Sequence, residues 1–147
     1  MTTGFQAPEL AELRDWWLAA RAGAAAPSLA AFDGAALSVD RARCVLLRVT
    51  EGGARIVYER FGAVPQGWHG RDMTGHATDD WPPANAAQAR RNVETTLAGM
   101  APVYRRLAAS APGMTGQTEK LMLPLLGPGG AAEYVLVATY ELAAASG

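Results

Sequence analysis

The chain has 147 residues, of which 50% are hydrophobic and 18% are charged, and its formal net charge at pH 7 is −1. This length and composition predict one folded domain over residues 1–147, and they exclude a disordered chain or a second catalytic or DNA-binding domain beside it. The 13 basic residues are scattered among 14 acidic ones. This distribution argues against a nucleic-acid partner, because phosphate backbones are bound by concentrated basic surfaces.

The first predicted element is a helix near residues 8–22. Pro8 suits the first helical turn, and the apolar residues that follow recur at the 3.6-residue period of a helix. Gly23 is expected to stop this helix. A mostly irregular stretch follows, in which we expect one helical turn near Leu37.

A β-hairpin is expected next. Residues 44–50 are apolar and β-branched, residues 55–61 alternate, and Glu51-Gly52-Gly53 supplies the turn. In the second strand, strict alternation would place Ile56, Tyr58 and Arg60 on one face and Val57, Glu59 and Phe61 on the other.

The second half of the chain is predicted to contain one helix and three strands. Residues 62–84 are rich in Gly, Pro, Trp and His, hold no period, and are expected to form short helical turns at most. A helix is predicted over residues 84–100 and ends before Pro102. Three strands follow, separated by turns, at residues 103–109, 117–126 and 133–142. Pro124 indicates that one side of the middle strand of these three is not fully paired.

These elements predict an α+β fold built on a five-stranded antiparallel sheet. Two strands alone are not stable in water, so the first hairpin must join the last three strands, in a core of about residues 40–142. The helical connector between them then covers one face of the sheet, and a small-molecule pocket is expected between the two. The N-terminal helix is expected either to cover the other face or to meet a second chain.

Five sequence blocks carry a resemblance to a known family. They are Trp16-Trp17 with Arg21-Ala-Gly23, Pro27 followed by Phe32-Asp33 and Leu37, Tyr58-Glu-Arg60-Phe-Gly62, Gly70-Arg71-Asp72-Met-Thr74-Gly75, and Glu119-Lys-Leu121-Met-Leu123-Pro124-Leu125. In this order they resemble short, stand-alone bacterial PAS-like proteins. The resemblance implies a PAS-like fold and a non-enzymatic sensory or regulatory module. Such a module would bind a small molecule or a protein partner and signal through the packing of its N-terminal helix.

Seven residues are candidate ligand contacts. Five are aromatic residues that would line the pocket or, alternatively, fill the core: Tyr58, Trp68, Trp81, Tyr104 and Tyr140. Arg71, in the Gly70–Gly75 block, would anchor an anionic ligand at the pocket mouth. In the alternative interpretation this block is a structural turn, in which Asp72 and Thr74 cap backbone N–H groups and Arg71 pairs with a carboxylate.

His76 is the remaining candidate. His69 and His76 suggest a metal or haem site, although their spacing is not that of a zinc motif and no cysteine accompanies them. We predict no metal site, and the sequence assigns no cofactor. His76 with Asp79-Asp80 also resembles an acid–base cluster, which leaves a small cone-fold enzyme of the isomerase or cyclase type as one alternative.

Trp16 and Trp17 are candidate interface residues. Adjacent positions on a helix point about 100° apart, so both cannot face the core. One is therefore expected to contact a protein partner or the second copy in a homodimer. The remaining alternative is a pure interaction scaffold whose core is filled by its own side chains.

The compartment is predicted from what the sequence lacks. The N-terminal residues carry neither the positive nor the apolar region of a secretory signal, and no apolar stretch approaches the roughly 18 residues of a membrane span. We therefore expect a cytoplasmic protein without membrane contact. Cys44 is the single cysteine, and in its apolar run we expect it to be a buried, inert thiol.

Overall fold

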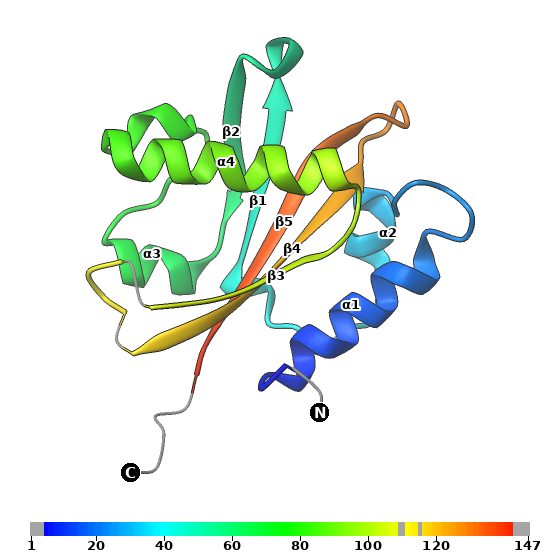
Figure 1. Cartoon of the computed structure of the whole chain (residues 1–147), viewed down its shortest axis with the longest axis horizontal. Helices are drawn as coiled ribbons and strands as arrows, with labels where there is room; N and C mark the ends of the chain where they lie inside the picture. The colour runs from blue at the N-terminus through cyan, green and yellow to red at the C-terminus, as the bar shows by residue number, and fades with distance from the viewer. Residues whose placement is uncertain (1–4, 109–110, 115, 143–147) are drawn as a thin grey trace.

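Both groups of strands belong to one antiparallel sheet. The computed structural model describes residues 5–108, 111–114 and 116–142. Its strands are β1 (Cys44–Thr50), β2 (Arg55–Phe61), β3 (Val103–Ala108), β4 (Gln117–Leu126) and β5 (Ala132–Glu141). Their order across the sheet is β2-β1-β5-β4-β3 (Figure 1). The predicted α+β class with a five-stranded antiparallel sheet is confirmed.

Helices cover both faces of this sheet. They are α1 (Pro8–Ala20), α2 (Leu29–Gly34), α3 (Ala63–His69) and α4 (Pro83–Gly99). The helices α3 and α4 come from the connector between β2 and β3 and cover the face that we call inner, whereas α1 and α2 cover the outer face (Figure 1). No helix in the described part of the chain is long and apolar enough to cross a membrane.

The outer core joins α1 to β4. The buried side of α1 packs against the outward side chains of β4 in one cluster that includes Leu10, Leu13, Trp17, Leu121, Leu123 and Leu125. The buried indole Nε1 of Trp17 donates a 2.8 Å hydrogen bond to the carbonyl oxygen of Pro124. The pairing of β3 with β4 begins at Val103 opposite Met122, so β3 does not reach Pro124. The incomplete pairing expected at Pro124 is therefore present.

A buried carboxylate holds the start of α1. Glu119 of β4 is 0% exposed, and it accepts hydrogen bonds from the backbone N–H groups of Gln6 and Ala7, at 3.1 and 2.5 Å. The hydroxyl of Tyr104 donates a third, at 2.7 Å, and Nη2 of Arg106 lies 3.9 Å away. The residue that precedes α1 offers no side-chain cap to its first turn. The Glu119 carboxylate instead places a negative charge at the N-terminus of the helix, where the helix dipole favours one.

Two helices lie where the sequence indicated irregular chain. The turn expected near Leu37 forms earlier, as α2, because the Ser28 hydroxyl accepts a 3.0 Å hydrogen bond from the Ala31 N–H and caps it. Residues 63–69 form α3 although they include Pro65. Pro65 is the third residue of α3, in the first turn, where a backbone N–H has no helical partner in any case.

The face pattern predicted for β2 is wrong at its end. The register slips between Leu46 and Leu47 of β1, which face Arg60 and Tyr58 of β2 and leave Glu59 as an extra residue. This bulge turns Phe61 to the inner side, where it packs with Ile56 and Tyr58. Strict alternation cannot anticipate an inserted residue.

The other element bounds agree with the sequence to within two residues. The first helix ends at Ala20 instead of residue 22, and β5 begins and ends one residue earlier than predicted. Strands β1, β2 and β4 have the predicted bounds. The predicted end of β3, residue 109, lies outside the described residues.

Candidate functional site

A cavity of about 350 Å³ lies between the inner face of the sheet and the helices α3 and α4. Pockets for small organic ligands have volumes of roughly 300–1,000 Å³. The apolar residues that line it include Val45, Leu47, Phe61, Trp68, Val93, Met122, Val135 and Val137. A mainly apolar interior of this size can enclose a small organic molecule.

Aromatic rings build the wall nearest β2. The indole Nε1 of Trp81 donates a 2.7 Å hydrogen bond to the Tyr58 hydroxyl, and burial raises the pKa of that hydroxyl. The ring centroids of Tyr58 and Phe61 lie 5.3 Å apart, and those of His69 and Trp81 lie 4.9 Å apart. These contacts fix the four rings in place in the wall of the cavity.

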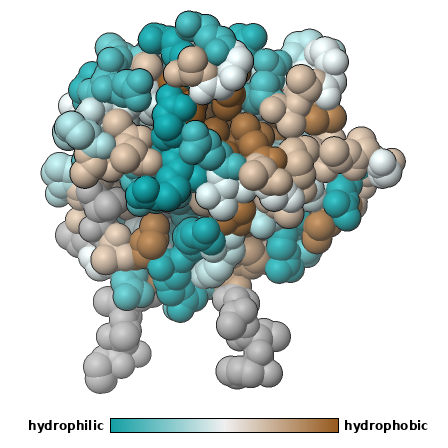
Figure 2. Space-filling model, turned by 45° about the horizontal axis from the view of Figure 1, so that its top comes forward, coloured by the Kyte–Doolittle hydropathy of each residue, from teal (hydrophilic) through white to brown (hydrophobic). Residues whose placement is uncertain are grey.

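Polar side chains of α4 lie at the rim. Asn85, Gln88 and Asn92 line the cavity, and Nε2 of Gln88 donates a 2.9 Å hydrogen bond to Oδ1 of Asn92. Asn85 and Gln88 are exposed, so among the described residues the cavity reaches the surface beside α4. On the face shown in Figure 2, hydrophobic side chains gather in one area that hydrophilic residues border.

Two basic residues, Lys120 of β4 and His69 of α3, line the cavity. Both are partly exposed. Burial lowers the pKa of Lys120. Burial, followed by the nearby positive charge of Lys120, lowers the pKa of His69, so these two groups lie within electrostatic reach of each other. His69 is therefore mainly a neutral imidazole at pH 7.

Three of the seven candidate ligand contacts line this cavity: Tyr58, Trp68 and Trp81. Arg71 lies next to it, with its guanidinium carbon 5.6 Å from the centroid of the Trp81 ring. Within the Gly70–Gly75 block, Asp72 accepts hydrogen bonds from the N–H and hydroxyl of Thr74. Gly75, at a φ of +84°, donates its N–H to the carbonyl of Tyr58. This block therefore pairs with the edge of β2 that no other strand covers.

The other three candidates lie away from the cavity. His76 is exposed, and its Nδ1 lies 3.1 Å from Oδ2 of Asp80. Tyr104 is on the outer side with Glu119 and Phe5. The hydroxyl of Tyr140, also on the outer side, accepts a hydrogen bond from the Asp40 N–H at 2.9 Å. Alternation along β3 and β5 placed these tyrosines on the face that α1 covers.

The two adjacent tryptophans have different environments. Trp17 is 0% exposed within the chain's own outer core, so its side chain is not at the surface. Trp16 is half-buried and packs edge-on against Phe32 of α2, with ring centroids 5.9 Å apart. The large apolar side chain exposed on α1 is Leu18, at 45%.

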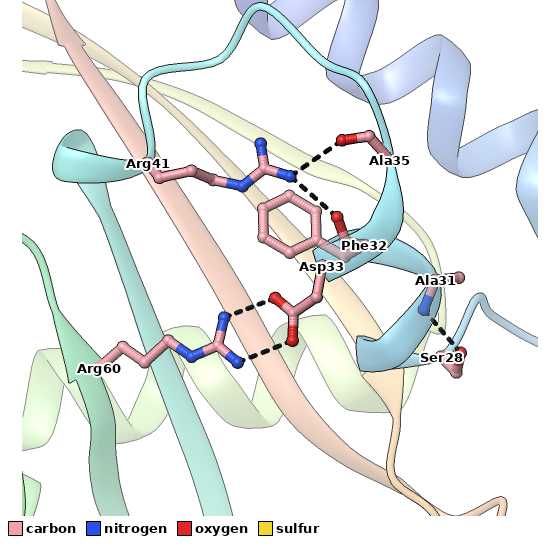
Figure 3. Close-up of polar contacts among 7 residues, drawn as sticks. All are labelled: Ser28, Ala31, Phe32, Asp33, Ala35, Arg41 and Arg60. Carbon is pink, nitrogen blue, oxygen red and sulfur yellow. Dashed lines mark hydrogen bonds and ion pairs between the residues drawn. The ribbon is translucent and has the colours of Figure 1, made fainter.

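A second cleft, of about 360 Å³, lies on the outer face beside α2. Its two arginines are engaged by the chain itself (Figure 3). Arg60 makes a bidentate pair with Asp33 at 2.7 and 2.8 Å, which lowers the pKa of Asp33. Nη2 of Arg41 donates to the carbonyl oxygens of Phe32 and Ala35 at 2.9 and 3.3 Å. These charges are already paired, which makes the inner cavity the better candidate site.

Cys44 lines this outer cleft and not the inner cavity. It is buried, and burial raises its pKa to about 12. The thiol is therefore protonated and unreactive at neutral pH, as predicted from its apolar surroundings.

Sequence reasoning missed Lys120. It is the only lysine in the chain, and it directly precedes the apolar part of its strand, residues 121–126. The alternation that places Leu121, Leu123 and Leu125 on one face puts Lys120 on the other. A lone lysine on a strand face that a predicted helix covers was the available signal.

No protein-family model matches the chain, and no curated protein matches it. Its structure is similar to that of a fungal LOV-domain photoreceptor described in the context of blue light and oxidative stress, with a TM-score of 0.44 and 15% sequence identity. The match covers 74% of this chain and 81% of that one. A likeness at this level concerns the arrangement of the backbone alone.

Proposed function

We propose that this chain is a non-enzymatic, PAS-like sensory module that binds a small organic molecule in the inner cavity. The observation that carries this proposal is the cavity itself: about 350 Å³, with apolar walls and a few polar groups. Those are the properties of small-molecule sites in general. A scaffold with a self-filled core would pack side chains into this space, so the cavity favours the sensor over the scaffold.

The arrangement of acidic groups gives no support to a cone-fold enzyme. Such an enzyme needs a carboxylate and a histidine within hydrogen-bond reach inside its cavity. The His76–Asp80 pair is exposed and lies outside the cavity. Within the described residues that line the cavity, His69 has no carboxylate beside it.

Strand β4 connects the cavity to the N-terminal helix. Its inner side chains Lys120 and Met122 line the cavity, whereas its outer Glu119 holds the residues that begin α1. A bound molecule that shifts β4 therefore also shifts the anchor of α1. The ligand changes the packing of α1 only to the extent that it binds the two packings with different affinity.

The protein partner, or a second copy in a homodimer, is proposed to meet the outward side of α1. The opposite side of α1 is occupied by the core of the chain through Leu10, Leu13 and Trp17. Leu18 and the exposed part of Trp16 remain available on the outward side. A change in how α1 packs would then reach the partner directly.

The proposal is tested by native mass spectrometry of the protein purified gently from its own cells. Wild type is compared with Ala89→Phe, which fills the cavity from α4, and with Ala87→Phe on the exposed side of the same helix. We expect a non-covalent small molecule on wild type and on Ala87→Phe, and its loss from Ala89→Phe. Bare protein in all three samples would refute the sensor and favour the scaffold.

A further inference from the structure

Among the described residues, the cavity carries a positive charge without a negative one. The described part of its lining includes Lys120 and no aspartate or glutamate. The acidic neighbour in sequence, Glu119, points to the outer face and is engaged there. Asp80 is paired with His76 outside the cavity. A counter-charge for Lys120 therefore does not come from the described residues around it.

The surroundings of Lys120 make this charge unusual. In the sheet it lies opposite Thr139 of β5 on one side and Arg105 of β3 on the other. The Lys120 side chain is partly exposed, and no hydrogen bond or ion pair joins its ammonium to another of the described residues. An ammonium that has lost part of its hydration and has no counter-charge is destabilised, which is why desolvated charges are normally paired. Exposed Arg105 adds to the positive potential and does not offset it.

The rest of the cavity indicates that the remainder of a ligand would be apolar. The side chains around Lys120 are mainly apolar, from Met122 and Val137 on the sheet to Trp68 and Trp81 opposite. An inorganic anion would leave these walls in contact with water, whereas an organic anion buries its apolar part against them. One ammonium balances a single negative charge, which fits a carboxylate better than a phosphate monoester of charge about −1.5 to −2.

We propose that the ligand of the inner cavity is an organic monocarboxylate, whose carboxylate pairs with the ammonium of Lys120 and whose aromatic or aliphatic body packs against the apolar walls. This inference rests on the proposed function and adds the chemical class of the ligand. His69 lines the same cavity and has a ring N–H that can donate a hydrogen bond to the second carboxylate oxygen.

The test compares acids with their neutral isosteres. Calorimetric titrations of the full chain use 4-phenylbutyrate against 4-phenylbutyramide, and octanoate against octanamide. Each acid is expected to bind wild type at least tenfold more tightly than its amide. Lys120→Met should remove this preference, Lys120→Arg should retain most of it, and Arg14→Met, on the exposed side of α1, should leave it unchanged.

Because Lys120 is the only lysine, selective ¹³Cε-lysine labelling gives one side-chain NMR signal from wild-type protein without any mutation. The acids should shift this signal and raise the pH at which it titrates, and the amides should not. Equal binding of acid and amide, a preference that survives in Lys120→Met, or no binding of any of the four probes would overturn the inference. A neutral molecule on the purified protein would overturn it and leave the sensor proposal standing, whereas bare protein would remove both.

Discussion

Glu119 and Lys120 are consecutive residues of β4 whose side chains lie on opposite faces of the sheet. Glu119 accepts the backbone N–H groups of Gln6 and Ala7 at the start of α1, and Lys120 lines the inner cavity. Where a strand has no bulge, successive residues point to opposite faces. One peptide unit thus joins the proposed ligand site to the anchor of the proposed output helix.

Glu119→Gln should loosen α1. The amide keeps the size of the carboxylate, but it removes the charge and offers one acceptor atom where three donors converge. Hydrogen bonds to a charged group contribute about 1.5–3 kcal/mol each, and we expect a loss of at least this amount in the free energy of unfolding. Urea unfolding measures it, with exposed Glu141→Gln as the control, expected to stay within about 0.5 kcal/mol of wild type. Equal stability of the two variants would contradict the anchor.

The adjacent tryptophans offer a matched pair of substitutions. Trp17→Phe removes the indole N–H that satisfies the buried carbonyl of Pro124 and leaves a gap in the outer core. We expect a loss of about 2–4 kcal/mol in the free energy of unfolding. Trp16→Phe, at a half-buried site, should cost about 1 kcal/mol or less. A larger effect at Trp16 than at Trp17 would be inconsistent with the packing of α1.

Lys120→Met should stabilise the ligand-free protein at pH 7, by about 1 kcal/mol, because it replaces a partly desolvated ammonium that has no counter-charge among the described residues with an apolar side chain of similar length. Burial lowers the pKa of Lys120 from its ordinary value of 10.5. As pH rises toward 10.5, the folded state loses this proton while the unfolded state still holds it, so wild-type stability rises relative to Lys120→Met. Urea unfolding of both proteins should show that the difference between their free energies of unfolding is smaller at pH 10 than at pH 7. An equal difference at the two pH values would mean that Lys120 is not desolvated.

His69 should make wild type sensitive to mild acid. Burial and the charge of Lys120 lower the pKa of His69 below its ordinary value of 6.5. As pH falls through 6.5, the unfolded state takes up a proton that the folded state does not, and stability is lost. Thermal unfolding between pH 7.5 and pH 5.5 should therefore show a steeper loss for wild type than for His69→Asn. If the melting temperatures of the two proteins fell equally with pH, His69 would be fully hydrated in the folded state, which would contradict this prediction.

The strands were predictable because their signals are local. Alternation and the glycine turn at residues 51–53 fixed β1 and β2, and Pro124 correctly indicated a partly unpaired stretch of β4. The bulge that turns Phe61 inward was not predictable in this way, because it depends on the pairing of β2 with β1. Helix α3 was not predicted because a proline such as Pro65 normally interrupts a helix. Pro65 is compatible with α3 only because it lies in the first turn.

The candidate site was less predictable than the fold. Tyr58, Trp68 and Trp81 were among the five aromatic residues predicted either to line the pocket or to fill the core, and the structure places them at the cavity. Tyr104 and Tyr140 fit the same description, but their strand register places them on the outer face. The sequence predicted a pocket between the sheet and the helical connector, where the cavity lies, but it did not show which strand side chains face that connector. The sequence did show Lys120 as a lone lysine on a strand face that a helix covers, but its place in a cavity was known only from the structure.

The link across β4 is tested most directly by hydrogen–deuterium exchange in wild-type protein with and without saturating 4-phenylbutyrate. The account predicts that occupancy of the cavity changes the exchange of the Gln6 and Ala7 amides and of the first turn of α1 severalfold, and leaves α2 unchanged. Calorimetric binding of the probe with no change in the exchange of α1 would contradict it.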